Sequence, residues 1–282
     1  MSKNTKFGAL YIVATPIGNL DDISKRALRC LRMVDLCAAE DTRISKKLFR
    51  KYDIDTNLIS YHKYSEKEKL VKFIDKLKQG LNIALISDAG TPLISDPGFL
   101  LVRAARDENI PIIPVPGPSS VTSALSVSGI PCDEFIFKGF PPKKGKAYDT
   151  FIEGLVSEER TTIFFVSKRN IIQLLLSLFD LDSSRIVFVA REMTKLHESF
   201  YRGEVKEVLR ELRSQNGQLK GEFVIVLQGI SKIEGDLHLN QEQEEILKVL
   251  LLKKSKKETA SLASKAFGFK KNYLYEYLIK EN

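Results

Sequence analysis

The chain reads Ser87-Asp88-Ala89-Gly90-Thr91-Pro92-Leu93-Ile94-Ser95-Asp96-Pro97-Gly98 between two apolar segments. The preceding segment, 83–87, is typical of a buried strand, and the following segment, 99–106, has the pattern of a helix. Two carboxylates, two glycines and two prolines crowd the turn between them. Because α/β folds bind ligands beyond the carboxyl ends of their strands, this turn is predicted to be a ligand site.

Strands and helices alternate through the first half of the chain. Strands are predicted at 10–14, 36–40, 57–61, 83–87 and 110–115, with helical spacing of apolar residues between several of them. Such alternation predicts an α/β domain built on a mostly parallel sheet. A further helix, rich in small residues, is predicted after Ser119 and Ser120.

The second half is predicted to form another α/β unit, which does not repeat the first in sequence. Strands are expected at 161–166, 186–190 and 223–227, and helices at 147–156, 171–179 and 205–215. From about Gly235 the strand patterns stop and lysines accumulate, which predicts a small, basic helical appendix. A helix-turn-helix-like unit and a tail that packs on the second domain both fit this appendix. The expected domains are 1–117, 118–232 and 233–282.

Composition limits the classes of partner and site. Lysine and arginine exceed the acidic residues by 8, which favours a polyanionic partner, with nucleic acid first. The three cysteines form no C-x-x-C pair, so no metal site is expected. No apolar run reaches the length of a membrane span, and the apolar segment near the start lacks a cleavage signature. A cytoplasmic protein without a membrane partner is therefore expected.

Several common cofactor motifs are missing from the sequence. No two of the 16 glycines stand two positions apart, which excludes the G-x-G-x-x-G loop that binds dinucleotides. Gly145-Lys146 resembles the end of a P-loop, but the first glycine of that motif would have to stand at Phe140. No G-x-S-x-G segment is present to hold a nucleophilic serine.

Four other segments accompany the turn, each after a predicted strand or near the junction of the two α/β units. They read Thr15-Pro16-Ile17-Gly18-Asn19-Leu20-Asp21-Asp22-Ile23, Ala39-Glu40-Asp41-Thr42-Arg43, Val115-Pro116-Gly117-Pro118-Ser119-Ser120 and Ala190-Arg191-Glu192-Met193-Thr194-Lys195. In this order, the five segments resemble the tetrapyrrole methylase superfamily. More closely, they resemble the ribosomal RNA small-subunit methyltransferase I family. The resemblance runs from Gly8 to Leu227 and closes with Lys220-Gly221-Glu222-Phe223.

The resemblance implies a function for the chain. Members of that family use S-adenosylmethionine to methylate the ribose 2′-hydroxyl of a cytidine in the decoding region of 16S ribosomal RNA, in the small (30S) subunit. It also implies two α/β domains with the cofactor in the cleft between them, and a homodimer. Two alternatives stay open: a methyltransferase that acts on a tetrapyrrole-like small molecule, and a ribosome-binding protein without enzymatic activity.

The cofactor is expected to touch residues from three parts of the chain. Glycine and proline let backbone groups of the turn face a ligand, and the free amides at a helix start can accept a carboxylate. The resemblance implies that Phe165, Ala190 and Arg191, the matching positions of the second domain, contact the adenine of the cofactor. The expected cofactor-binding residues are Pro16, Asp88, Ala89, Gly90, Ile94, Ser119, Ser120, Phe165, Ala190 and Arg191.

A ribose hydroxyl needs a general base, because it is a poor nucleophile until it loses its proton. The candidate catalytic residues are Glu40, Asp41, Glu192 and Lys195, and a lysine serves only if its pKa is depressed. Structural ion pairs are the alternative for these charges. Cations that can follow an RNA backbone are Arg43, Lys46, Lys143, Lys144, Lys168 and Arg169, with ordinary solvated side chains as the alternative.

One stretch departs from the family pattern. Members carry a Tyr-Glu-Ser-Pro-His-Arg-like sequence after the strand at 161–165, whereas this chain reads Phe165-Val166-Ser167-Lys168-Arg169-Asn170. The acidic residue and the proline are absent, but the basic charge of Lys168 and Arg169 remains. A contact of this stretch with phosphate is therefore still expected.

Overall fold

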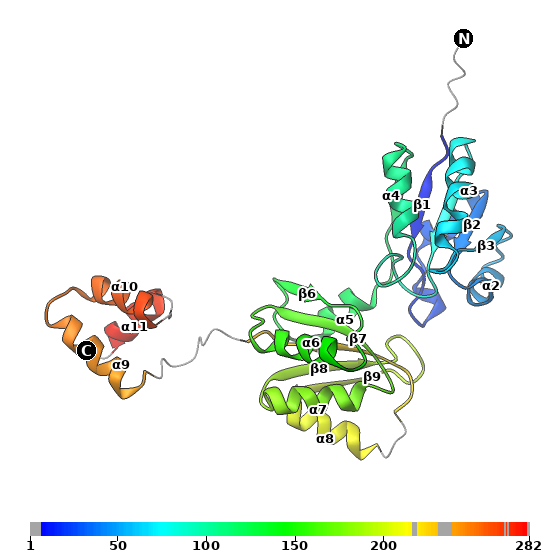
Figure 1. The fold of residues 1–282 in the computed structure, drawn as a ribbon. Coiled ribbons are helices and arrows are strands. Elements are labelled where there is room, and N and C mark those ends of the chain that lie inside the picture. Colours follow the sequence, from blue (N-terminus) through cyan, green and yellow to red (C-terminus); the bar gives the residue numbers. More distant parts are fainter. Residues whose placement is uncertain (1–6, 216–218, 231–238, 268, 270, 281–282) are drawn as a thin grey trace, which may run out of the picture. The chain divides into compact units, whose positions relative to one another are not determined.

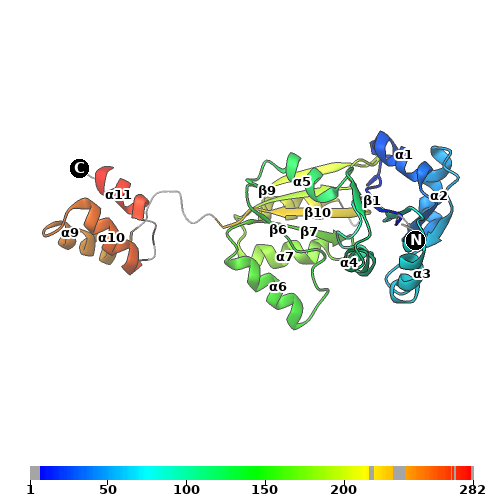
Figure 2. The ribbon, with the colours of Figure 1, turned by 90° about the horizontal axis from the view of Figure 1, so that it is seen from above.

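The computed structural model of the chain describes residues 7–215, 219–230, 239–267, 269 and 271–280. Two compact units follow one another, residues 1–229 and residues 230–282. The first unit contains two five-stranded sheets, and the second is helical (Figures 1 and 2).

The first sheet is parallel throughout, in the order β3-β2-β4-β1-β5. Its strands are β1 (Leu10–Val13), β2 (Leu36–Ala39), β3 (Leu58–Ser60), β4 (Ile83–Ile86) and β5 (Ile112–Val115). The mostly parallel sheet predicted for this half is therefore confirmed. β4 lies between β1 and β2, so the segments that follow these three strands meet at one edge of the sheet.

Helices cover both faces of this sheet. Alternate residues of each strand point to opposite faces. Thus Ala84 and Ile86 pack with α1 (Lys25–Met33) and α2 (Thr42–Lys51), while Ile83 and Leu85 pack with α3 (Glu66–Lys78) and α4 (Phe99–Asp107). A short 3-10 helix, η1 (Leu20–Asp22), precedes α1.

The second sheet is mixed, in the order β6-β7-β10-β8-β9, and only β6 and β7 pair in parallel. Its strands are β6 (Phe135–Phe137), β7 (Thr161–Ser167), β8 (Ile186–Arg191), β9 (Ser199–Glu204) and β10 (Glu222–Leu227). One face packs with α6 (Lys146–Val156), α7 (Ile171–Leu181) and α8 (Val205–Ser214), and the other with α5 (Ser120–Ser128). Because β10 lies between β7 and β8, Val224 pairs with both Phe165 and Ala190.

The C-terminal unit contains α9 (Gln241–Leu251), α10 (Lys256–Phe267) and α11 (Lys271–Lys280). These helices share a core of their own, made of Leu239, Leu247, Ala260, Ala263, Leu274 and Leu278. The helical appendix predicted from the sequence is present, although residues 233–238, 268, 270, 281 and 282 of the expected range lie outside the described residues. The domain boundaries at 117 and 232 stay predictions, as does the role of the appendix.

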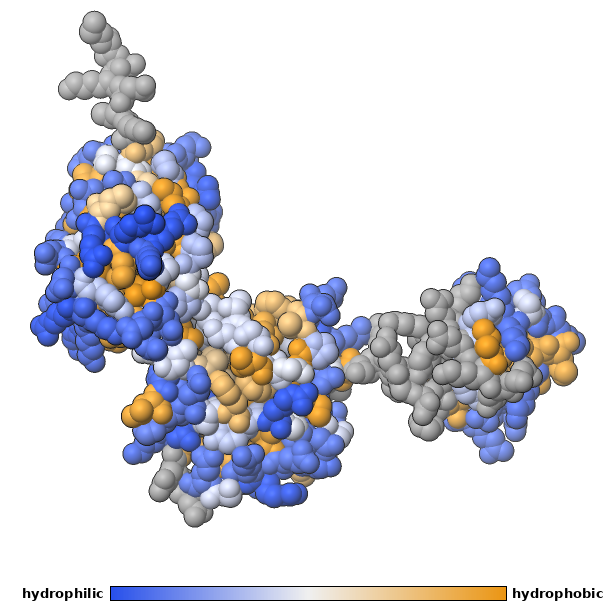
Figure 3. Space-filling model, turned by 180° about the vertical axis from the view of Figure 1, so that it is seen from behind, coloured by the Kyte–Doolittle hydropathy of each residue, from blue (hydrophilic) through white to orange (hydrophobic). Residues whose placement is uncertain are grey.

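On the face that Figure 3 shows, hydrophilic residues predominate and apolar residues gather in small patches on the first unit. Among the residues that the structure describes, every helix is too short or too polar to cross a bilayer, and no three His, Cys, Asp or Glu side chains are grouped to hold a metal ion. Cys132 is exposed, whereas Cys30 and Cys37 are buried. Burial raises the pKa of the Cys30 thiol to about 11.

Candidate functional site

The turn between β4 and α4 follows an unusual backbone path. Gly90, Leu93, Ser95 and Gly98 all have positive φ, at +82°, +73°, +73° and +125°. For a residue other than glycine this conformation costs of order 1–3 kcal/mol, and it is found mainly at ligand sites and switch regions. The shape of the turn is therefore imposed by the contacts around it.

Two sets of hydrogen bonds hold the turn. Thr15, two residues after the end of β1, and Gly90 exchange both backbone hydrogen bonds, at 2.9 and 3.0 Å. Further along, the buried Glu66 of α3 accepts from the backbone amides of Gly98 and Leu100, at 3.1 and 3.0 Å. The β1 end and α3 thus fix the two ends of the segment.

The turn forms one wall of a cavity of about 610 Å³. This volume lies in the range that holds small ligands, roughly 300–1,000 Å³. The other walls come from the start of α5, the end of β7, the loop after β8, and the start of β10. The cavity is lined by Ile17, 89–91, 94–96, Ser119, Ser120, Phe140, 165–168, Ala190, Glu192, Met193, Lys195 and 221–224.

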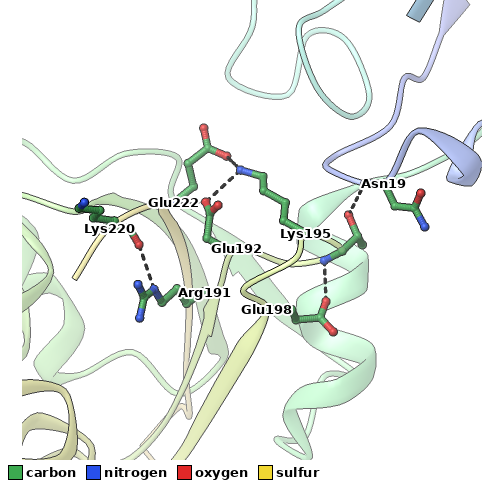
Figure 4. A network of polar contacts seen from close by, with 8 residues as sticks. Asn19, Arg191, Glu192, Lys195, Glu198, Lys220 and Glu222 are labelled. Atoms are coloured by element: carbon green, nitrogen blue, oxygen red, sulfur yellow. Dashed lines mark hydrogen bonds and ion pairs between the residues drawn. The ribbon is translucent and has the colours of Figure 1, made fainter. Parts of the chain in front are cut away.

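Most residues predicted to bind the cofactor line this cavity. They are Ala89, Gly90, Ile94, Ser119, Ser120, Phe165 and Ala190. Three others do not line it. Pro16 is buried directly after Thr15, and Asp88 Oδ1 accepts from the backbone amide of Asp41 at 3.0 Å. Arg191 donates to the Lys220 carbonyl at 2.9 Å (Figure 4). It also donates to Gln215 Oε1 at 3.0 Å. Their roles toward a cofactor stay predictions.

A carboxyl group that the sequence analysis did not select also lines the cavity. Burial, and then the negative charge of Glu40, raise the pKa of Asp96 to about 6. Burial and Asp88 raise the pKa of Glu40 as well, and burial raises that of Asp88. Close carboxylates resist simultaneous ionisation, so Asp96 can hold or release a proton near neutral pH.

Asp41 has a structural role in this arrangement. It is the N-cap of α2, where Oδ1 accepts from the Arg43 amide at 2.8 Å, and Oδ2 lies 2.6 Å from Arg43 Nη2. The side-chain hydrogen bond from Arg43 lowers the pKa of Asp41 to about 2. Neither Asp41 nor Glu40 lines the cavity. The side chain of Arg43 is 88% exposed and stays accessible to a phosphate.

Glu192 and Lys195, the other two candidate catalytic residues, form an ion pair at the cavity. Lys195 Nζ lies 2.9 Å from Glu192 Oε1 and 2.8 Å from Glu222 Oε2 (Figure 4). Burial opposes the charge of Lys195, but its hydrogen bonds to Glu222 and Glu192 outweigh this effect and raise its pKa. Burial likewise opposes ionisation of Glu192, but the Lys195 and Glu222 hydrogen bonds lower its pKa. The pair is therefore charged at neutral pH.

The loop that carries this pair depends on two distant glycines. Glu192 and Thr194 have φ of +50° and +63°. A Cβ on Gly221 would lie 2.4 Å from Glu192 Cγ, and one on Gly18 would lie 2.5 Å from Thr194 Oγ1. The same Thr194 oxygen accepts from the Asn19 amide at 3.0 Å. The segments at 15–23 and 190–195 are thus in direct contact.

The cations predicted to contact RNA lie on three elements. Lys46 is exposed on α2, Lys143 and Lys144 are exposed before α6, and Lys168 and Arg169 are exposed after β7. Lys143, Lys168 and Arg169 line a second cavity, of about 520 Å³. This cavity shares Phe140 and residues 165–168 with the first.

Known proteins resemble this chain in sequence over most of its length. The tetrapyrrole (corrin/porphyrin) methylase family matches residues 9–209. The chain is 42% identical to ribosomal RNA small subunit methyltransferase I of Haemophilus influenzae over 271 residues, 96% of each chain. It is 40% identical to the protein of that name from Escherichia coli O157:H7, over 99% of this chain and 98% of the relative. The chain belongs to the ribosomal RNA small subunit methyltransferase I family.

Solved structures support the fold of this methyltransferase family member. A diphthine synthase aligns with a TM-score of 0.61 and 14% identity, covering 78% of this chain and 92% of that chain. A cobalt precorrin-4 methyltransferase aligns with a TM-score of 0.56 and 18% identity, over 77% and 94%. The predicted tetrapyrrole methylase α/β fold is confirmed.

In this member of the family, sequence reasoning missed part of the cavity wall. Asp96 and Ser95 lie in the turn itself but were not selected, and Gly221 and Glu222 lie in the segment that closes the family resemblance. The Lys220-Gly221-Glu222-Phe223 motif was the sequence feature that could have identified Gly221 and Glu222 as cavity residues. Their place beside Glu192 follows from the pairing of β10 with β8.

Proposed function

We propose that this chain transfers a methyl group from S-adenosylmethionine to the ribose 2′-hydroxyl of a cytidine in the decoding region of 16S ribosomal RNA. The observation that carries the proposal is the near full-length similarity to ribosomal RNA small subunit methyltransferase I proteins. The cavity that joins the β4–α4 turn to Glu192 and Lys195 supports it. We expect the enzyme to act in the cytoplasm, on the small subunit, as a homodimer.

The residues of the first cavity fit S-adenosylmethionine in three respects. Phe165, Ala190 and Val224 provide an apolar wall for an adenine. The first turn of α5 has no acidic residue and no side-chain cap, so its amides and the Ser119 and Ser120 hydroxyls can receive a carboxylate. Asp96 offers a carboxylate to an ammonium group or a ribose hydroxyl. When bound, the cofactor supplies a methyl group attached to a positively charged sulfur atom.

The ion pair then acts on the acceptor hydroxyl. The ionised carboxylate of Glu192 accepts the hydroxyl proton, and the Lys195 ammonium, held by Glu192 and Glu222, stabilises the negative charge that develops on the oxygen. Because the pKa of Lys195 is raised, little of its neutral amine is present at neutral pH to serve as a general base. Positioning of the two reactants supplies the rest of the rate enhancement.

The charge of the chain favours RNA as the acceptor. The net charge is +8, and the exposed cations Arg43, Lys46, Lys143 and Lys144 are available to phosphates. A tetrapyrrole-like acceptor would not require these cations, and a ribosome-binding protein without activity would not require the charged pair at the cavity.

The test is methylation of 30S particles from a strain that lacks the enzyme, with labelled S-adenosylmethionine. We expect label in 2′-O-methylcytidine after digestion of the 16S RNA to nucleosides, and no incorporation into particles that already carry the modification. Label on a base would contradict the proposed acceptor atom. Absence of label from RNA would favour one of the two alternatives, which a parallel incubation with tetrapyrroles distinguishes.

A further inference from the structure

The second cavity opens beside the first, on the other side of a shared wall. Phe140 and residues 165–168 line both, so an extended ligand that enters the first cavity lies next to the second. At about 520 Å³ the second cavity has the size of a small-ligand pocket. Its shared wall includes Val166, Ser167 and Lys168, part of the stretch that departs from the family pattern.

Positive charge dominates this second cavity. Lys143, Lys168 and Arg169 line it, and of the lining residues that the structure describes none is acidic. These three cations form no ion pair with any described residue. Charged side chains that remain unpaired around a hollow favour an anionic ligand.

The start of α7 adds to this preference. Asn170, Gln173 and Leu174 line the cavity, and α7 begins at Ile171. The Asn170 side chain makes no cap hydrogen bond, and the first turn has no acidic residue. The start of α7, which has no side-chain cap and no acidic residue in its first turn, therefore borders a basic hollow, an arrangement that suits a phosphate.

An aromatic ring completes the lining. Phe140 is 62% exposed although it packs against Phe165, with ring centroids 5.3 Å apart. The preceding Gly139, with φ of +61°, turns the chain, and its carbonyl accepts from the Phe165 amide at 2.8 Å. Phe140 is thus held in place beside β7 and offers a stacking surface to a nucleobase.

We propose that the second cavity binds the nucleotide next to the methylated one, with its base against Phe140 and its phosphate between Arg169, Lys168 and the start of α7. This inference rests on the proposed function, because it takes the acceptor to be single-stranded RNA. A nucleotide unites an anion with a flat aromatic base, and the lining supplies a partner for each.

The test uses the full-length chain and a short single-stranded RNA that carries 2-aminopurine next to the acceptor cytidine, since stacking changes the fluorescence of this base. We expect a fluorescence change with the wild-type protein. Phe140→Ala should abolish the change and weaken binding roughly tenfold, whereas Phe140→Trp should retain both. Phe99→Ala is the matched control, because Phe99 is 61% exposed and lines neither cavity.

A charge variant tests the phosphate-binding side of the pocket independently. Lys143→Ala with Arg169→Ala removes two cations that line only the second cavity. The slope of log affinity against log salt should become shallower by about 0.7 for each phosphate that the variant no longer neutralises. Lys67→Ala with Lys72→Ala, on the exposed surface of α3, removes the same charge and should leave the slope unchanged. Affinity for S-adenosylmethionine, measured by calorimetry, reports that each variant is folded.

Methyl transfer to 30S particles is measured in parallel. Transfer by the wild type, with a fluorescence change that does not depend on Phe140, would overturn the nucleotide pocket and leave the proposed function intact. A fluorescence change that depends on Phe140, without methyl transfer to 30S particles, would support the nucleotide pocket and contradict the proposed function. A response to free adenosine monophosphate but not to the RNA would assign the cavity to a small phosphorylated molecule and overturn the inference.

Discussion

The backbone of Gly221 passes so close to Glu192 that a Cβ on Gly221 would lie 2.4 Å from Glu192 Cγ. Gly221 also has φ of +104°, which side-chain-bearing residues rarely adopt. Gly221→Ala should therefore displace Glu192, lower kcat at least tenfold and destabilise the protein by about 1–2 kcal/mol. Methylation kinetics and thermal unfolding measure the two effects.

Gly154→Ala is the control for this substitution. Gly154 lies within α6, and the nearest atom to its Cβ would be Lys138 Nζ, at 3.8 Å. Alanine there should leave kcat unchanged and raise stability by up to about 1 kcal/mol. Equal kinetics for Gly221→Ala and wild type would show that Glu192 does not need its present position.

Lys195→Met should lower kcat by roughly 100-fold while affinity for S-adenosylmethionine changes little. Lys195 also lowers the pKa of Glu192, so Glu192 should become protonated at a higher pH in the variant. As the pH falls, the variant should therefore lose its residual activity at a higher pH than the wild type does. The pH–rate profiles of the two proteins measure this shift. Lys195→Arg, which keeps the charge, should preserve the wild-type acid limb, and an unshifted acid limb in Lys195→Met would separate Glu192 from the proton transfer.

Asp96→Asn should stabilise the protein at neutral pH. The folded-state pKa of Asp96 is raised from 3.8 to about 6 by burial and by Glu40. The contribution of the Asp96 carboxyl to the stability of the folded state is therefore complete below pH 4 and is lost as the pH rises through about 6. Because this group is partly exposed, we discount the expected gain in stability. The variant should then have a Tm about 2–4 °C higher than the wild type at pH 7. The difference should vanish below pH 4, and a pH-independent difference would argue against this titration.

Glu66→Gln should weaken the anchoring of the β4–α4 turn. The carboxylate of Glu66 accepts from the amides of Gly98 and Leu100, and hydrogen bonds to charged groups contribute about 1.5–3 kcal/mol. We expect about 1–2 kcal/mol of destabilisation in denaturant unfolding and a several-fold loss of S-adenosylmethionine affinity in calorimetry. Glu68→Gln, exposed on the same helix, should change neither by more than about 0.5 kcal/mol.

Strands buried on both faces could be predicted from the sequence because they are continuous apolar runs. Ile83–Ile86 and Leu36–Ala39 are examples, and each prediction differs from the structure by one residue at its end. The edge strand β9 was not predicted, because Ser199-Phe200-Tyr201-Arg202-Gly203-Glu204 is largely polar and pairs only with β8. Its strand conformation depends on that pairing more than on its own composition.

In the candidate site, too, features set by neighbouring residues could be predicted from the sequence, whereas features set by contacts between distant residues could not. The β4–α4 turn was found because strand ends in α/β folds hold ligands, a rule that needs only local sequence. The ion pair of Lys195 with Glu222 depends on β10 being inserted between β7 and β8, a contact between residues 27 positions apart. The raised pKa of Asp96 depends on its burial and on Glu40, which follows another strand. The residue type and sequence position of Asp96 therefore did not distinguish it from other carboxylates.

The distribution of the three cysteines offers a practical means of labelling. Cys30 and Cys37 lie inside the core around α1 and β2, whereas Cys132 is exposed shortly before β6. A thiol-specific fluorophore or spin label should therefore attach to the native protein at a single position, without mutagenesis. From that one attachment point, distances to a labelled RNA or to a second copy of the chain become directly measurable in solution.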